Sequence, residues 1–241
     1  MQENDRAIEL GHPSYVWRFG QNRRFQLIRR HTRLDGARIL DVGCGLGLYV
    51  RQFRAHSPQV YGVDIDAEKV ATASQTLPHI TRAPAEELPF PAGTFDVLLL
   101  HEVLEHVTDD RRAVAEAWRV LRPGGRMVVF APNRWYPFET HGIFWRGRYH
   151  FGNIPLVNYL PARLRAGLCP HVRAYTPGDL RALFAGLPGR LIVHTQIYPG
   201  YDKIAARSRA LALVFRGLTY TLEHTPLRRL GLSHFLVFEK A

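Results

Sequence analysis

Residues 39–47 read ILDVGCGLG, an apolar run that meets an acid and continues into three glycines at alternating positions. A strand followed by such a turn is typical of an α/β protein, which binds ligands at the carboxyl ends of its parallel strands. Glycine lets the turn adopt unusual backbone angles and lets a ligand approach the backbone. The stretch is not the GxGxxG dinucleotide fingerprint, because its third glycine comes one residue early and Leu48 takes that place. No Gly-Lys-Ser/Thr follows, which excludes a Walker A phosphate loop.

Alternating strand and helix patterns around this stretch predict the fold class. Strands are expected at 38–42, 60–63, 79–82, 95–100 and 126–130, and helices at 48–53, 66–77 and 109–121. Apolar runs that are continuous rather than alternating are typical of parallel strands covered on both faces. We therefore predict an α/β, Rossmann-like, doubly wound and mostly parallel seven-stranded sheet with helices on both faces.

The chain is expected to form a single domain over residues 1–241. A leading amphipathic helix is predicted within 14–35, and the half from 36 to 131 is expected to bind the ligand. Residues 132–175 hold five prolines and many aromatics with little regular periodicity, which predicts a cap insertion after the fifth strand. Residues 176–241 are expected to complete the sheet and to carry an extra helix over 205–222.

A second acid follows the second predicted strand. Asp64 lies 17 residues after Gly47, where dinucleotide-binding folds place a carboxylate that accepts hydrogen bonds from ribose hydroxyls. The alternative is an acid that only caps a helix or turn. Together with the glycine turn, this acid predicts a ligand that carries a ribose.

Five motifs in register resemble those of class I S-adenosylmethionine-dependent methyltransferases, with a likeness to ubiquinone-type O-methyltransferases. They are DVGCGLG (41–47), VDID (63–66), AEELPF (85–90), FDVLLLHEVLEHV (95–107) and LRPGG (121–125). The resemblance covers about residues 36–131 and implies S-adenosylmethionine as the cofactor. It implies that the methionine part is bordered by Asp41, Gly43, Cys44, Gly45 and Gly47. It also implies that Asp64 holds the ribose, that Ile65, Ala85 and Glu86 border the adenine, and that His101 faces the sulfonium.

The stretch HEVLEH, which begins at His101, contains several possible metal ligands. His101 and His106 are five positions apart, so a helix would not place them on one face, and a zinc-protease motif is excluded. Glu102, Glu105 and His106 would share a helical face and, with His141, could hold Mg²⁺, Mn²⁺ or Zn²⁺. This spacing resembles the metal motif of small-RNA 3′-end 2′-O-methyltransferases. The alternative is that Glu105 and His106 make only structural hydrogen bonds.

An acceptor pocket is expected beneath the leading helix and the cap, where aromatic residues are dense. The candidate substrate residues are Tyr15, Trp17, Asn133, Trp135, Phe138, Trp145 and His150. The same aromatics could instead simply pack the irregular cap. His106 and His141 are the candidate catalytic bases for an oxygen nucleophile, because an unperturbed histidine has a pKa of about 6.5.

The net charge of +11 is unevenly distributed along the chain. Residues 1–140 contain 18 Lys and Arg against 17 Asp and Glu, whereas residues 141–241 contain 14 against 4. Such an excess can indicate nucleic acid or an anionic membrane as a partner.

We expect methyl transfer to an oxygen of a small molecule. RNA ribose 2′-O-methylation and a non-catalytic cofactor-binding module are the alternatives, and segments 156–168 and 205–222 predict peripheral membrane contact.

Two further observations predict where the protein is found. The N-terminal residues show no basic-then-apolar signal pattern, and no uninterrupted apolar run approaches 18 residues. The two cysteines, Cys44 and Cys169, are expected to be reduced. These features favour a cytoplasmic protein.

Overall fold

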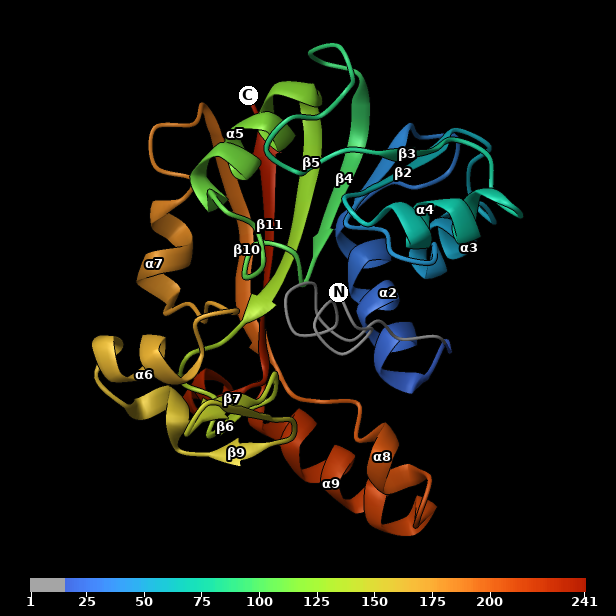
Figure 1. Cartoon of the computed structure of the whole chain (residues 1–241). Helices are drawn as coiled ribbons and strands as arrows, with labels where there is room; N and C mark the ends of the chain where they lie inside the picture. The colour runs from blue at the N-terminus through green and yellow to red at the C-terminus, as the bar shows by residue number, and fades with distance from the viewer. Residues whose placement is uncertain (1–15) are drawn as a thin grey trace.

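The computed structural model describes residues 16–241, and its centre is a seven-stranded sheet (Figure 1). The strand order is β10-β11-β5-β4-β1-β2-β3. These strands are β1 (Ile39–Val42), β2 (Val60–Asp64), β3 (Ile80–Arg82), β4 (Phe95–His101), β5 (Leu121–Pro132), β10 (Gly189–Ile197) and β11 (Ser233–Lys240). Strands β1 to β5 pair in parallel, and β11 runs antiparallel to both β5 and β10. The predicted Rossmann-like, mostly parallel α/β fold is confirmed.

Two apolar cores lie on opposite faces of this sheet, because successive side chains of a strand point to opposite faces. In β4, Leu98 and Leu100 belong to one core, whereas Val97 and Leu99 belong to the other. All four side chains are buried. A sheet covered on both faces therefore explains the continuous apolar runs in the sequence.

Helices cover both faces of the sheet (Figure 1). Helices α5 (Asp110–Val120) and α7 (Pro177–Ala182) supply one core, and α2 (Phe19–His31) and α3 (Leu48–Phe53) supply the other. Helix α4 (Ala67–Ser74) begins after Asp66, whose carboxylate accepts hydrogen bonds from the backbone N–H groups of Glu68 and Lys69. Asp66 is therefore the N-cap of α4. The predicted leading helix is α2, which buries Phe25 and Ile28.

The order of the strands creates a crevice between β1 and β4. These two strands are neighbours, yet the chain continues from β1 to β2 on one side and from β4 to β5 on the other. The loops that follow them therefore diverge, which leaves space at the carboxyl ends of the strands.

The cap contains more regular structure than its sequence indicates. Two short antiparallel pairs form, β6 (Phe138–Glu139) with β9 (Ile154–Pro155) and β7 (Ile143–Trp145) with β8 (Arg148–His150). They are followed by the 3₁₀ turn η1 (Val157–Tyr159) and helix α6 (Ala162–Leu168). A small core of Val157, Cys169 and Val172 holds them together. The cap lies beyond the carboxyl ends of the parallel strands (Figure 1).

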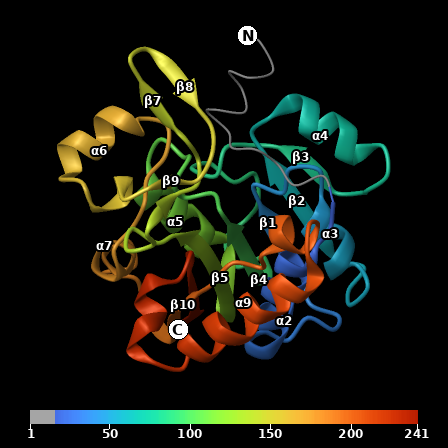
Figure 2. The same ribbon diagram turned by 90° about the horizontal axis from the view of Figure 1, so that it is seen from below.

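The single helix predicted over 205–222 is instead two helices, α8 (Asp202–Ala205) and α9 (Arg209–Leu222). Ser208 separates them, because its hydroxyl accepts a hydrogen bond from the backbone N–H of Leu211 and so begins a new helix. A 3₁₀ turn, η2 (Pro226–Leu230), leads from α9 to β11. Figure 2, which looks onto the carboxyl ends of the strands, shows α9 crossing this side of the molecule near α2. Within residues 16–241, no helix has the length and apolar character needed to span a bilayer.

Candidate active site

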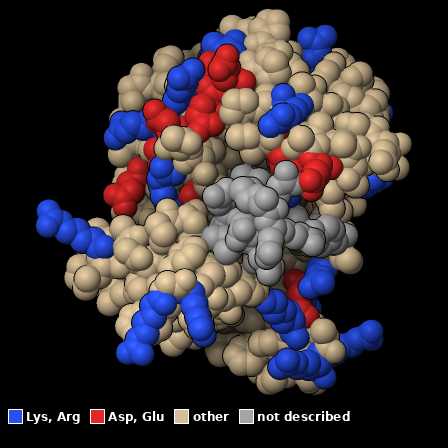
Figure 3. All heavy atoms as spheres, in the orientation of Figure 1, with Lys and Arg blue, Asp and Glu red and all other residues tan. Residues whose placement is uncertain are grey.

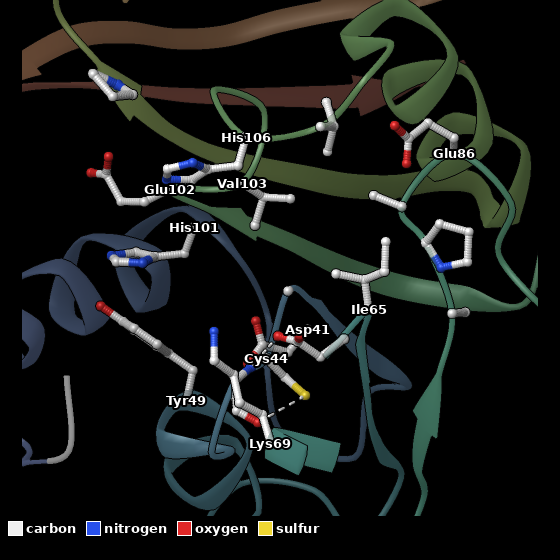
Figure 4. Close-up of a pocket in the computed structure, with 18 of the residues that line it drawn as sticks. Asp41, Cys44, Tyr49, Ile65, Lys69, Glu86, His101, Glu102, Val103 and His106 are labelled. Carbon is white, nitrogen blue, oxygen red and sulfur yellow. Dashed lines mark hydrogen bonds between the residues drawn. The ribbon is translucent and has the colours of Figure 1, made fainter. Parts of the chain in front are cut away.

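A cavity of about 730 Å³ opens at the carboxyl ends of β1, β2 and β4. Its walls come from the glycine turn after β1, the end of β2, the loops after β3 and β4, and helix α2. Figure 4 shows Ile65 and Glu86 at one end and His101, Glu102 and His106 at the other. The two ends have different chemistry. By the roles that the sequence resemblance implies for their residues, they are called the cofactor end and the acceptor end.

The cofactor end is built by the glycine turn. Gly45 has φ +53°, and a side chain added there would meet no atom within 4 Å, so its backbone is open to a ligand. Gly47, with φ +76°, is the N-cap of α3 and would collide with Leu77 if it carried a side chain. Gly43, Cys44 and Gly45 line the cavity, whereas Gly47 does not. Gly47 was expected to border the methionine part, but it has a structural role in the turn instead.

Asp64 connects the glycine turn to the end of β2. Its Oδ2 accepts a hydrogen bond from the Gly45 backbone N–H at 2.8 Å, and its Oδ1 accepts one from the Asp66 N–H at 2.9 Å. Each carboxylate oxygen has a second lone pair, so both can still accept from ligand hydroxyls. Asp64 lines the cavity, and the adjacent Ile65 side chain is half exposed beside it. This arrangement fits a ribose with an attached aromatic base.

Two further groups of the cofactor end are buried in the turn. Burial, followed by the negative charge of Asp64, raises the pKa of Asp41 well above its usual range. Burial also raises the pKa of the Cys44 thiol, so this cysteine is not a thiolate nucleophile at neutral pH. Ala85 and Glu86 line the same end, as expected. The carboxylate of Glu86 accepts from the Thr108 backbone N–H at 2.8 Å, which connects the loops after β3 and β4.

The acceptor end contains a charged network that the sequence does not reveal. Nη1 of Arg24 lies 2.8 Å from Nε2 of His101 and 3.1 Å from Oε1 of Glu102. Nη2 of Arg24 donates to the Ser233 hydroxyl at 2.8 Å, and that hydroxyl donates to Glu102 at 2.8 Å. Because a guanidinium only donates, Nε2 of His101 accepts and the imidazole is neutral. Burial and the Arg24 charge accordingly lower the pKa of His101 to about 3.

Glu102 is held in an unusual conformation within this network. Its φ of +54° is in the left-handed region, which costs a non-glycine residue about 1–3 kcal/mol. Burial alone would raise its pKa, but the Arg24 charge lowers it to about 2. The residue is therefore a fixed carboxylate paired with Arg24.

The predicted helical face formed by Glu102, Glu105 and His106 is wrong, because the chain after β4 forms turns rather than a helix. A partly different set of possible metal ligands comes together. One ligand atom each from Glu105, His106 and His141 lies within 4.8 Å of the others. Both Glu105 oxygens and His106 Nδ1 are buried and have no hydrogen-bond partner. Burial, followed by the charge of Glu102, raises the pKa of Glu105, whereas burial and His141 lower the pKa of His106 to about 4.

His141 is oriented by a buried carboxylate. Its Nδ1 lies 3.0 Å from Oε1 of Glu139, and Oε2 of Glu139 accepts from Nη2 of Arg165 at 2.6 Å. Although burial opposes ionisation, the hydrogen bond and charge of His141 and the charge of Arg165 lower the pKa of Glu139 to about 2. A permanent carboxylate at Nδ1 keeps the proton on that nitrogen, which leaves Nε2 of His141 as the free acceptor.

The substrate residues predicted from aromatic density do not line the cavity. Trp17 packs edge-on against Phe25 and Tyr49, and the buried Asn133 amide donates to the carbonyls of Arg229 and Gly231. Four more lie elsewhere in the cap and its approach, namely Trp135, Phe138, Trp145 and His150. Tyr15 lies outside the described residues. The irregular cap therefore uses most of its aromatics for packing or leaves them exposed.

Other residues take the place of these candidates at the acceptor end. They are Gln21, Arg24, Tyr49, Thr140, Leu232 and Ser233, together with the expected His106 and His141. His101, which was expected to face the sulfonium, lines the cavity beside them. The Tyr49 hydroxyl is buried without a hydrogen-bond partner, and its ring centroid lies 4.7 Å from that of His101. An unsatisfied hydroxyl in the wall of a cavity indicates a ligand contact. The sequence could have indicated Tyr49 as a site residue by its position, because it directly follows the glycine turn.

Comparison with known proteins identifies the glycine turn and the strands around it. Residues 40–129 match the family described as methyltransferase domain. A ubiquinone biosynthesis O-methyltransferase of Rhodopseudomonas palustris (strain BisB18) is 39% identical over 112 residues, which cover 44% of this chain and 44% of that protein. A probable S-adenosylmethionine-dependent methyltransferase of Mycolicibacterium smegmatis is 36% identical over 104 residues, which cover 42% of this chain and 40% of that protein. The chain thus matches less than half the length of these curated relatives.

Solved structures resemble nearly the whole chain. An S-adenosylmethionine-dependent methyltransferase from Mesorhizobium loti has a TM-score of 0.62 at 20% identity and covers 90% of this chain and 97% of its own. The cyclase SpnF also has a TM-score of 0.62 at 20% identity and covers 95% of this chain and 84% of its own. At such identities the likeness establishes the fold. Residues 40–129 thus match a methyltransferase domain, and the whole chain has the fold of an S-adenosylmethionine-dependent methyltransferase.

Proposed function

We propose that this protein transfers the methyl group of S-adenosylmethionine to an oxygen of a small-molecule acceptor. The observation that carries the proposal is one cavity in which Asp64 and the open Gly45 backbone lie at one end and the Glu139-oriented His141 lies at the other. The named activity of the ubiquinone biosynthesis O-methyltransferase supports an oxygen acceptor.

The residues of the cofactor end fit S-adenosylmethionine. Asp64 would accept from the ribose hydroxyls, and Ile65, Ala85 and Glu86 would border the adenine. Asp41, Gly43, Cys44 and Gly45 would hold the methionine part. When bound, the cofactor supplies a methyl group that is activated by its sulfonium. The protein's contribution is to bring an acceptor atom in line with that methyl group, since placement is the main requirement of such a displacement.

At the acceptor end, His141 is the proposed general base. An acceptor hydroxyl would give its proton to Nε2 of His141 as its oxygen bonds to the methyl carbon. The bond from that carbon to the sulfonium sulfur would break, which leaves S-adenosylhomocysteine. Glu139 would hold the Nδ1 proton in place throughout. His106 is neutral at physiological pH, because its pKa is lowered to about 4, and it can donate or accept a hydrogen bond without adding charge.

A second candidate role for the same cluster is a divalent metal site. Two carboxylate oxygens and an imidazole nitrogen without partners, next to His141, are an unsatisfied donor set of the kind that Mg²⁺, Mn²⁺ or Zn²⁺ accepts. Such an ion would act as a Lewis acid on the acceptor oxygen. Glu102 is not part of this convergent group, and its Oε1 is engaged by Arg24 and Ser233.

The proposal is tested by incubating the protein with S-adenosylmethionine and a panel of phenolic, catecholic, sugar and RNA acceptors. Mass spectrometry should detect S-adenosylhomocysteine together with an acceptor that carries one added methyl group on oxygen. Methylation of nitrogen or carbon, or of RNA ribose with a steep loss of affinity on adding salt, would contradict the proposed acceptor class. Retained cofactor with no transfer to any acceptor would support a non-catalytic role.

The metal candidate is tested on the same acceptor. Protein stripped by a chelator and verified by elemental analysis should lose activity and regain it with Mg²⁺, Mn²⁺ or Zn²⁺. Full activity in the stripped protein would contradict the metal proposal. His141 would then be the group that activates the acceptor.

A further inference from the structure

Helix α9 has an unusual distribution of apolar residues. Its buried positions are Ala212 and Thr219. The opposite side carries Leu211, Val214 and Leu218, which are spaced by three and four positions and so share one helical face. In an ordinary surface helix the large apolar residues face the core. Here they face outward.

The exposure of this face is large. Val214 and Leu218 are 67% and 60% exposed, and Leu211 is 49% exposed. Leu213, at the edge of the apolar surface, is 65% exposed. A contiguous apolar patch on the surface of a protein indicates an interaction site. Helix α9 also lies outside residues 40–129, so the patch is not part of the shared methyltransferase match.

Basic residues surround the patch. Residues 201–230 contain six Lys and Arg against two Asp and Glu. Both acids are engaged internally: Asp202 accepts from the backbone N–H groups of Phe19 and Gly20, and Glu223 pairs with Arg23. Five basic side chains are exposed, namely Lys203, Arg207, Arg209, Arg228 and Arg229. Figure 3 shows Lys and Arg projecting along the lower edge of the molecule, where α8 and α9 lie.

The patch does not suit a second copy of the chain. A symmetric dimer through α9 would bring two identical basic borders together, and like charges that face each other oppose association. An anionic lipid surface satisfies both features, since headgroups attract the basic border and the acyl boundary accepts the apolar face. We propose that α9 and its basic border dock the protein on an anionic membrane surface.

The cap extends this surface on the same side of the molecule. Nζ of Lys203 in α8 lies 5.6 Å from the ring centroid of Phe151, which follows β8 and is 53% exposed. Trp145 in β7 is also 53% exposed. Aromatic side chains favour the interface between water and lipid. The docking surface lies beyond the carboxyl ends of the strands, as the cavity does (Figures 1 and 2).

The test is co-sedimentation of the full-length protein with vesicles of phosphatidylcholine alone or of phosphatidylcholine and phosphatidylglycerol in equal parts. Binding should require phosphatidylglycerol and weaken as salt is added. Leu211→Gln with Leu218→Gln should reduce binding to the anionic vesicles about tenfold or more. Arg207→Gln with Arg209→Gln should reduce it about fivefold for each arginine.

Matched controls lie at the other end of the sheet. Leu191→Gln removes an exposed leucine near the start of β10, and Arg29→Gln with Arg30→Gln removes two exposed arginines from the last turn of α2. Each control should bind vesicles as the wild type does. Cofactor binding in solution should be unchanged in the α9 variants, so this outcome is independent of the proposed activity.

Three results would overturn the proposal. The first is equal binding to both kinds of vesicle, and the second is an equal loss of vesicle binding in the α9 variants and in the control variants. The third is a concentration-dependent dimer, seen in sedimentation, that the α9 leucine substitutions abolish. The third result would assign the patch to a second copy of the chain.

Discussion

The two ends of the cavity are held by different kinds of interaction. The cofactor end is made by backbone groups, glycines and short-range contacts, such as the Gly45 N–H that donates to Asp64. The acceptor end is made by side-chain contacts between residues that are far apart in the chain, such as Arg24 with Ser233 and Glu139 with Arg165. The difference indicates that binding and catalysis can be separated by substitution, because few contacts are shared.

The largest expected effect is on catalysis. His141→Gln should lower kcat by about 10²–10⁴-fold, since it removes the proposed base. Glu139→Gln should lower kcat less and shift its pH profile, because the imidazole remains but loses its orienting charge. Steady-state kinetics with the identified acceptor measures both. A wild-type kcat in His141→Gln would exclude His141 as the base.

The next effect is on stability at the acceptor end. Arg165→Met leaves Glu139 as a buried carboxylate without its guanidinium partner, which should lower the free energy of unfolding by about 3–5 kcal/mol. Urea denaturation measures it, with the exposed Arg163→Met as control. Adding Glu139→Gln to Arg165→Met should restore part of the loss. An unchanged midpoint in Arg165→Met would show that the pair does not stabilise the cap.

A smaller effect is expected from pH. The pKa of His106 is about 4 in the folded protein and about 6.5 when unfolded, so below pH 6.5 the unfolded state binds more protons. The contribution of His106 to the free energy of unfolding is therefore fully present above about pH 6.5 and is lost as the pH falls toward 4. His106→Asn should make the fall in the free energy of unfolding over this range shallower by about 1–3 kcal/mol. Parallel curves for the two proteins would show that His106 is not buried as a neutral group.

The smallest effect concerns Tyr49. Tyr49→Phe removes only a buried hydroxyl without a partner, so stability should stay the same or rise slightly. If that hydroxyl contacts the acceptor, the KM for the acceptor should rise by about fivefold. Thermal unfolding and steady-state kinetics measure the two quantities. An unchanged KM would show that the unpaired hydroxyl does not contact the acceptor.

The cofactor end was predictable because its chemistry lies in contiguous motifs. The strand, the glycine turn and Asp64 follow one another within 26 residues, from Ile39 to Asp64, and local backbone preferences decide their shape. Gly47 was expected at the ligand site but does not line the cavity, and the cause is again local. The turn ends in a helix cap whose glycine resembles in sequence the cavity-lining glycines before it.

The acceptor end was not predictable from the same evidence. Arg24 and Ser233 are 209 positions apart and meet only because α2 and β11 both reach the carboxyl end of β4. The helical spacing of Glu102, Glu105 and His106 failed because Glu102 adopts a left-handed conformation that begins a turn. His141 was found by residue type, but its partner Glu139 comes from cap pairing that no periodicity indicates.

The most direct test of the two-ended cavity is calorimetric titration with S-adenosylhomocysteine of the wild type, Asp64→Asn and His141→Gln. We predict that the wild type binds, that Asp64→Asn binds at least about tenfold more weakly because it loses the charged acceptor, and that His141→Gln binds as the wild type does. No binding by folded wild-type protein, or an equal loss in both variants, would contradict the assignment of the cofactor to the Asp64 end.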